Sequence, residues 1–222
     1  MMDHDGATPG PRPIQDASSA KALSTGNARI RGGRAAEVRD AALTLFARDG
    51  YAGTGMIDIA RLLNLEAPSL YNHMSSKGEL LRELCASAME ELLARQRDGL
   101  TQPDPVARLR SITEAHVAYS ATHPREVTIT AREFIHLDGQ PRQQILDLRR
   151  DYERGFRTVI NQGREAGVFD VDHPKLASYA IIEMGLAVAE WYRQAGRLSV
   201  EAVAREYGRF ALRIVRCRDE DG

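Results

Sequence analysis

Hydrophobic residues recur at helical spacing near the start of the chain, in three short patterns separated by two turns. The first pattern covers residues 34–49, with apolar positions three or four residues apart at Val38, Ala41, Ala42, Leu45 and Phe46. The apolar face of the second comprises Ile59, Leu62 and Leu63. The third, over residues 67–73, turns Leu70 inward. The second and third patterns have the spacing of a helix-turn-helix, in which one helix braces another against DNA.

Residues with special backbone preferences mark the ends of these helices. Gly50 accepts the left-handed conformation in which many helices end, and Asn64 tolerates it at the following turn. We expect Thr54 to cap the second helix by accepting a backbone N–H. Pro68 suits the first turn of the third helix, where its missing N–H has no role. Ser76 is the expected cap of the next, longer helix.

Polar side chains occupy the faces of the third helix that point away from Leu70. They are Ser69, Tyr71, Asn72 and His73. The major groove, about 12 Å wide, admits one such helix, and polar side chains read its base edges. The free N–H groups of a helix N-terminus attract phosphate, so we expect Lys77, which opens the next helix, to contact the DNA backbone. An ordinary surface or packing role is the alternative for Tyr71, His73 and Lys77.

The overall charge of the chain does not indicate nucleic-acid binding. The formal net charge is −1 and the pI about 6.6, so a basic surface must be local. Arg29, Arg31 and Arg34 form an arm without acidic residues that is expected to reach phosphate or the minor groove, although a solvated tail is the alternative. Residues 1–28 are rich in small residues and poor in large apolar ones, which predicts disorder.

From residue 77 onward the chain has the pattern of helices joined by short connections. The expected helices cover residues 77–98, 105–122, 124–137, 142–166, 174–194 and 199–216. The sequence predicts an all-α protein of about nine helices. Residues 29–76 form a three-helix, helix-turn-helix DNA-binding domain, and residues 77–217 form a helical ligand-binding and dimerisation domain.

The last two long helices are apolar on more than one side. Their apolar residues include Ala177, Ile181, Val188, Trp191, Val203, Phe210 and Ile214. A helix with this pattern needs more than one neighbour. One neighbour is the body of the same chain, and the other is either more of that body or the same helix of a second subunit.

The sequence lacks the signals that mark several other classes of protein. We find neither a signal peptide nor an apolar stretch long enough to span a membrane, which favours a cytoplasmic protein. Cys85 and Cys217 stand alone, and the histidine spacing fits no common metal site. The GxxxxGK, GxSxG and HExxH motifs are absent. We therefore expect a protein that is not an enzyme and holds no metal or cofactor.

The N-terminal pattern resembles the TetR family of bacterial one-component repressors over about forty-five residues. The residues that carry the resemblance are Ala41-Ala42-x-x-Leu45-Phe46, Gly50-Tyr51, Thr54, Ile59-Ala60, Leu70-Tyr71 and Ser76-Lys77-x-x-Leu80-Leu81. It implies a homodimer that pairs its last two long helices, a double-stranded DNA operator and a small-molecule effector. The chain departs from the family pattern at Asn64, Glu66 and Met74, which bears on the operator sequence more than on the function.

Two C-terminal runs resemble regulators of fatty-acid, aromatic-acid and sterol breakdown, several of which sense acyl-CoA thioesters. They are Asp151-Tyr152-Glu153-x-x-Phe156 continuing to Phe169, and Glu190-Trp191-Tyr192-Arg193 followed by Gly196-Arg197-Leu198-Ser199. The resemblance implies a repressor that leaves a palindromic operator when its effector binds, with an acyl-CoA as a candidate effector.

Candidate effector contacts are polar or amphipathic residues on the predicted body helices, because ligand pockets between helices are mostly apolar with a few polar groups. They are His116, Tyr119, Arg132, His136, Arg149 and Trp191. An internal ion pair is the alternative for Arg132, and core or dimer packing for Trp191. Two other functions stay open. One is a multidrug-sensing repressor of an efflux gene, and the other is a helical interaction module that does not bind DNA.

Overall fold

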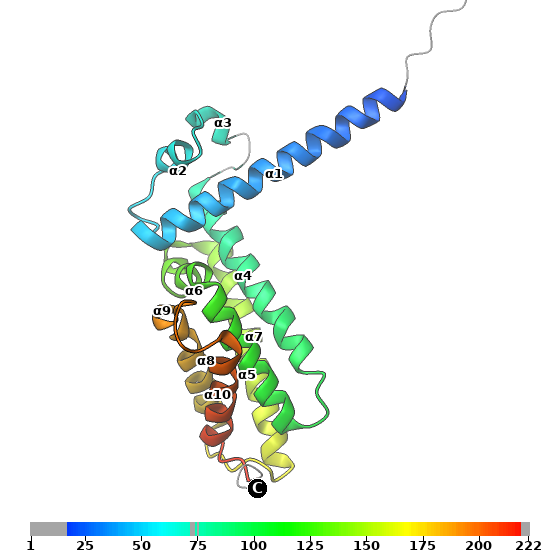
Figure 1. The fold of residues 1–222 in the computed structure, drawn as a ribbon, viewed down its shortest axis with the longest axis vertical. Coiled ribbons are helices and arrows are strands. Elements are labelled where there is room, and N and C mark those ends of the chain that lie inside the picture. The colour runs from blue at the N-terminus through cyan, green and yellow to red at the C-terminus, as the bar shows by residue number, and fades with distance from the viewer. Residues whose placement is uncertain (1–16, 72–73, 75, 219–222) are drawn as a thin grey trace, which may run out of the picture.

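The computed structural model describes residues 17–218 apart from 72, 73 and 75, and it describes side chains from residue 33 onward, with Ala67 also excepted. Every regular element in this part of the chain is helical, which confirms the all-α prediction (Figure 1). None of the described helices is long and apolar enough to cross a membrane.

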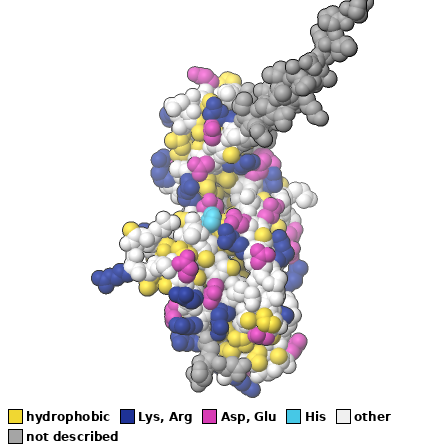
Figure 2. Space-filling model, turned by 45° about the vertical axis from the view of Figure 1, so that its right-hand side comes forward, with side chains coloured by type: hydrophobic (Ala, Val, Ile, Leu, Met, Phe, Trp, Pro, Cys, Tyr) yellow, Lys and Arg dark blue, Asp and Glu magenta, His cyan; other side chains and the backbone are white. Residues whose placement is uncertain are grey.

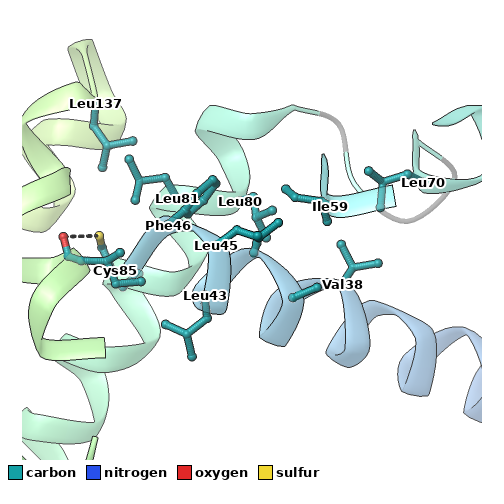
Figure 3. Packing of buried hydrophobic residues seen from close by; sticks show 14 of the residues in the cluster. Val38, Leu43, Leu45, Phe46, Ile59, Leu70, Leu80, Leu81, Cys85 and Leu137 are labelled. Atoms are coloured by element: carbon teal, nitrogen blue, oxygen red, sulfur yellow. Dashed lines mark hydrogen bonds between the residues drawn. The ribbon is translucent and has the colours of Figure 1, made fainter. Parts of the chain in front are cut away.

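Three helices and the start of a fourth build a head at one end of the molecule (Figure 1). They are α1 (Ala17–Asp49), α2 (Met56–Leu62), α3 (Ala67–Tyr71) and α4 (Lys77–Gly99). Figure 3 shows their shared core, to which α1 contributes Val38 and Phe46, α2 Ile59 and α3 Leu70. These side chains are at most 1% exposed, as their helical spacing predicts.

The remaining helices form an elongated body. They are α5 (Pro105–Thr122), α6 (Pro124–Thr128), the π-helical turn η1 (Ile129–Glu133), the 3-10 turn η2 (Phe134–His136), α7 (Gly139–Glu165), α8 (Pro174–Leu186), α9 (Val188–Trp191) and α10 (Val200–Ile214). Helix α10 packs on α5, and α7 packs on α4. Helix α4 belongs to both parts, because its first turns pack in the head and the rest in the body (Figure 1).

Most of the predicted helix ends are confirmed. Gly50, Asn64 and Gly167 have φ angles of 78°, 53° and 75°, the left-handed conformation expected where a helix stops. The hydroxyl of Ser76 accepts the backbone N–H of Glu79 at 3.1 Å. Asp104 and Ser199 cap α5 and α10 in the same way.

The second helix differs from its prediction in two details. Gly55, rather than Thr54, is its N-cap, because Asp58 reaches back and accepts the Gly55 N–H at 2.9 Å. Thr54 is buried instead, and its hydroxyl donates to the Gly50 carbonyl at 2.9 Å. Leu62, expected in the core, is 50% exposed, because the short helix turns Ile59 and Ala60 inward.

Helix boundaries differ at four further places, of which the smallest is the start of α7 at Gly139 instead of residue 142. The backbone of α1 is helical from Ala17, so residues 17–28 extend a helix where composition predicts disorder; propagating an existing helix needs no new nucleus. The predicted helix over 124–137 is divided into α6, η1 and η2. The one over 174–194 breaks at Ala187, and its chain becomes extended at Tyr192.

Candidate DNA-binding head and effector cavity

Helix α3 presents polar side chains on the outside of the head. Leu70 is fully buried against α1 and α2, which fixes the rotation of the helix. That rotation leaves Tyr71 55% exposed, Pro68 exposed and Ser69 half-buried. Asn72 and His73, the other two predicted base-reading residues, lie outside the described residues. The described part of α3 therefore has one face in the core of the head and the opposite face exposed.

The predicted arginine arm lies on α1. Arg29 and Arg31 belong to the helical backbone, and their side chains lie outside the described part. Arg34 is exposed, and its guanidinium lies 2.6 Å from the carboxylate of Glu37, one turn later. On the body face shown in Figure 2, basic and acidic side chains are intermixed. This face of the body therefore offers no basic patch for DNA.

Lys77 is held inside the head. Its ammonium donates to the carbonyls of Tyr51 and Thr54, both at 2.9 Å, and lies 4.1 Å from the centre of the Tyr51 ring. Two of its three donors are therefore used within the protein. These contacts join the start of α4 to the turn after α1 and leave one donor for the predicted phosphate contact, which stays a prediction.

Tyr51 is also the point where the head meets the body. Its backbone N–H donates to the carboxylate of Glu133, at the end of η1, at 2.9 Å. Its ring stacks on His136 with centroids 5.2 Å apart and meets Phe46 edge-on. His136, predicted as an effector contact, therefore belongs to this junction. A second tie joins Arg125 on α6 to Thr44 and Asp40 on α1.

A cavity of about 330 Å³ lies in the body between α4, α5, α6, η1, α7 and α8. Its apolar wall includes Met89, Leu92, Val127, Ile182 and Leu186. Three predicted effector contacts, His116, Tyr119 and Arg149, line it together. Its volume is at the lower end of the range for small-molecule sites.

His116 is fully buried and hydrogen-bonded on both ring nitrogens. Its Nε2 lies 3.0 Å from the Ile182 carbonyl and must donate to it, so Nδ1 accepts from the Tyr152 hydroxyl at 2.9 Å. Burial lowers the pKa of His116 to about 4, so the ring is neutral near pH 7. Gly185 makes room for it, since a Cβ there would lie 2.3 Å from the His116 ring. This network joins α5, α7 and α8 around the cavity.

Three polar side chains at the cavity lack a protein partner in the described structure. The hydroxyls of Tyr119 and Thr130 are buried without a hydrogen bond. Burial raises the pKa of Tyr119, so its phenol is neutral. Arg149 is half-buried, stacks 4.3 Å from the centre of the Phe134 ring, and has no ion pair within the described residues. Buried polar groups normally have partners, so the two hydroxyls are unusual among the lining residues.

Comparison with known proteins identifies the family. Residues 38–84 match the bacterial regulatory proteins of the tetR family, and residues 102–215 match the tetracyclin repressor-like C-terminal domain. The chain belongs to the TetR family. The two matches correspond to the head with the first turns of α4, and to the body from the loop before α5 to the end of α10.

Individual TetR-family proteins resemble this chain over most of its length. The HTH-type transcriptional repressor KstR2 of Mycobacterium tuberculosis is 32% identical over 177 residues, which cover 78% of this chain and 88% of KstR2. The structure of that ketosteroid transcriptional regulator has a TM-score of 0.75 at 31% identity and covers 81% of this chain and 93% of its own. AibR, solved with isovaleryl coenzyme A and operator DNA, has a TM-score of 0.74 at 22% identity, covering 83% and 99%. That identity supports the shared fold alone.

Two other predicted effector contacts of this TetR-family chain lie away from the cavity. Arg132 is exposed and paired with Glu190, beside a separate surface hollow of about 170 Å³. Trp191 is 47% exposed and stacks on Tyr207. The turn η1 directs Thr130 and Ala131 towards the cavity, and Arg132 therefore lies outside it. The prediction of a regular helix over 124–137 did not include this turn.

Several lining residues were missed in the sequence. Thr130, Tyr152, Tyr179, Glu126, Glu153 and Glu183 line the cavity but were not candidates. Tyr152 lies in a clear apolar stripe, so packing was the natural interpretation. Glu153 is held by the Ser178 hydroxyl at 2.7 Å and lies 3.5 Å from Arg157. Within the described residues, there is no group of three or more His, Cys, Asp or Glu side chains that could hold a metal ion.

Proposed function

We propose that this TetR-family protein is a repressor whose operator affinity falls when a small organic acid, or its CoA thioester, enters the body cavity. Residues 29–76 would bind the operator, and residues 77–217 would bind the effector and a second subunit. One observation carries the proposal. The segment that lines the cavity through Thr130 and Ala131 also holds the head through Glu133.

The two ends of this segment explain how an effector would act. A ligand that bonds Thr130 on η1 must displace or rigidify the turn that ends at Glu133. Such a ligand changes DNA affinity only if it binds one head position better than the other. A coupling of about 1–3 kcal/mol would change operator affinity roughly 5- to 150-fold. Helix α4 offers a second route, because it lines the cavity through Met89 and is tied to the head through Lys77.

Homodimerisation belongs to the same proposal. Five large exposed apolar side chains belong to the last helices and the segment between them: Leu176, Tyr179, Trp191, Leu198 and Phe210. If these side chains form one contiguous patch in the dimer region, they would supply a protein interface. A symmetric pair would place two α3 helices in successive major grooves, roughly 34–36 Å apart.

DNA selection by the purified protein tests the proposal, followed by release of the selected site. We expect near-palindromic sites, with the logarithm of affinity falling by about 0.9 per phosphate contact for each unit of log salt. Acids and CoA thioesters of the fatty, aromatic and sterol-derived classes are then titrated into the complex. Sites without dyad symmetry would argue against the dimer, and the absence of DNA binding would favour an interaction module.

A cation-sensing repressor is the second candidate. Tyr119, Tyr152 and Tyr179 line the cavity together with Glu126 and Glu183, for which the described structure gives no ion pair. Aromatic rings and carboxylates suit lipophilic cations. Release of the operator by a lipophilic cation, and by none of the acids or thioesters, would favour this function.

A further inference from the structure

Among the described residues that line the cavity, Arg149 is the one whose side chain is positively charged near pH 7. It stacks on Phe134 and has neither a hydrogen bond nor an ion pair within the described chain, and burial lowers its pKa more than the charge of Glu183 raises it. Removing a cation from water without a partner is unfavourable, and a carboxylate can satisfy a guanidinium through two parallel bonds. Arg149 therefore favours a ligand that brings a negative charge.

The acidic lining residues limit how much negative charge the ligand can carry. Glu153 is held by Ser178 and lies close to Arg157. Glu126 and Glu183 also line the cavity, and the described structure gives neither an ion pair. A ligand with several phosphates would be repelled by these two carboxylates, whereas a single carboxylate beside Arg149 meets a local attraction. The charges therefore favour a monoanion.

The cavity size and the unpartnered hydroxyls describe the rest of the ligand. About 330 Å³ accommodates an apolar body of modest size but not the nucleotide part of coenzyme A. The hydroxyls of Tyr119 on α5 and Thr130 on η1 are buried without a normal hydrogen bond, and Thr130 has only the Cys85 thiol, a weak partner, beside it. A keto or hydroxyl oxygen on the apolar body would supply a hydrogen-bond partner.

We propose that the effector is a free monocarboxylic acid with an apolar body and a keto or hydroxyl oxygen. Its carboxylate pairs with Arg149, and its second oxygen bonds the hydroxyls of Tyr119 and Thr130. This inference rests on the proposed function and narrows its ligand class. It distinguishes the free acid from the CoA thioester, because thioester formation removes the carboxylate that Arg149 would bind.

The test uses matched sets of medium-sized keto and hydroxy acids with linear, aromatic or alicyclic bodies. Each acid is compared with its CoA thioester and its primary amide, which keeps the shape but removes the charge. Binding to the full chain is measured by calorimetry, and release of the selected operator by gel shift. We expect an acid to bind and release the DNA, with the amide weaker by about tenfold or more.

Two arginine variants give the matched comparison. Arg149→Gln should weaken binding of the acid by about ten- to hundredfold and leave the amide little changed. Arg132→Gln removes a similar charge outside the cavity and should leave acid binding unaltered. Thermal melting of each variant checks the fold. If Arg149→Gln does not fold, Arg149→Lys and the acid-against-amide comparison on the unaltered chain take its place.

The outcomes separate this inference from the proposed function. Binding of thioesters but not free acids overturns the free-acid effector and leaves the acyl-CoA alternative standing. Acid binding that is lost in Arg132→Gln and kept in Arg149→Gln overturns the role of Arg149. Equal binding of acid and amide overturns the role of Arg149. No release by any acid or thioester, from a protein that binds its operator, overturns the proposed function as well.

Discussion

The carboxylate of Glu133 accepts the backbone N–H of Tyr51 at 2.9 Å, across 82 positions of sequence. Glu133 ends the turn η1, and Tyr51 follows the last residues of α1. The His136 ring stacks on Tyr51 and its Nε2 lies 3.5 Å from the same carboxylate. The head is therefore attached to the wall of the cavity by a hydrogen bond that a shift of η1 would alter.

Glu133→Ala should uncouple the effector from DNA. It removes the acceptor of the Tyr51 N–H, whereas Glu133→Gln keeps an amide oxygen in its place. We expect the alanine variant to bind the operator but to lose most of the 5- to 150-fold effector response given by a coupling of about 1–3 kcal/mol. Operator affinity with and without effector is the measurement. An unchanged response in Glu133→Ala would leave α4 as the route.

Tyr71 and Ser69 should affect DNA binding in different ways. Tyr71 is exposed on α3, and we expect its hydroxyl to contact phosphate, which positions the protein without reading sequence. Tyr71→Phe should therefore weaken all sites to a similar extent, while Ser69→Ala should alter preference at one base pair by about 1–3 kcal/mol. Affinities for a set of single-base operator variants measure both. If both folded variants bind every site normally, α3 does not face the groove.

Lys77→Met should lower stability rather than the salt dependence of DNA binding. The ammonium donates to two backbone carbonyls that would lose their charged partner. We expect a loss of about 2 kcal/mol in the free energy of unfolding. The salt slope measured on the folded variant should match that of the unaltered chain. A slope smaller by about one would instead mean that Lys77 contacts a phosphate.

Stability should fall when the pH drops below about 6.5, because of His116. Burial lowers its pKa to about 4 in the folded protein, against about 6.5 when unfolded. The unfolded chain binds the extra proton first, so stability present above pH 6.5 is lost as the pH falls towards 4. Protonation of His116 should lower the free energy of unfolding by about 2 kcal/mol between pH 7 and pH 5. Urea unfolding of the unaltered chain and of His116→Asn, each at pH 7 and pH 5, measures this loss. An equal pH dependence of stability in the two proteins would contradict the role of His116.

Local signals in the sequence determined the helices of the head. Val38, Ile59 and Leu70 recur at helical spacing, so their burial followed from periodicity. Gly50 and Asn64 marked the turns, because few other residues take a positive φ without strain. The resemblance to the TetR family rested on the same stretch, and the family matches confirmed it. Signals of this kind act within a few residues of one another, and a sequence displays them directly.

Contacts between distant segments were decided by the tertiary structure. Arg132 and Arg149 are similar in the sequence, but the π-helical turn directs one to the surface, while packing of α7 directs the other to the cavity. Lys77 donates to carbonyls 23 and 26 positions away, a contact that periodicity did not indicate. The rotation of one helix against another depends on how all the side chains between them pack. The periodicity of the sequence therefore indicated a pocket between the body helices. Only the packing of those helices shows that Arg149 lines the cavity and that Arg132 does not.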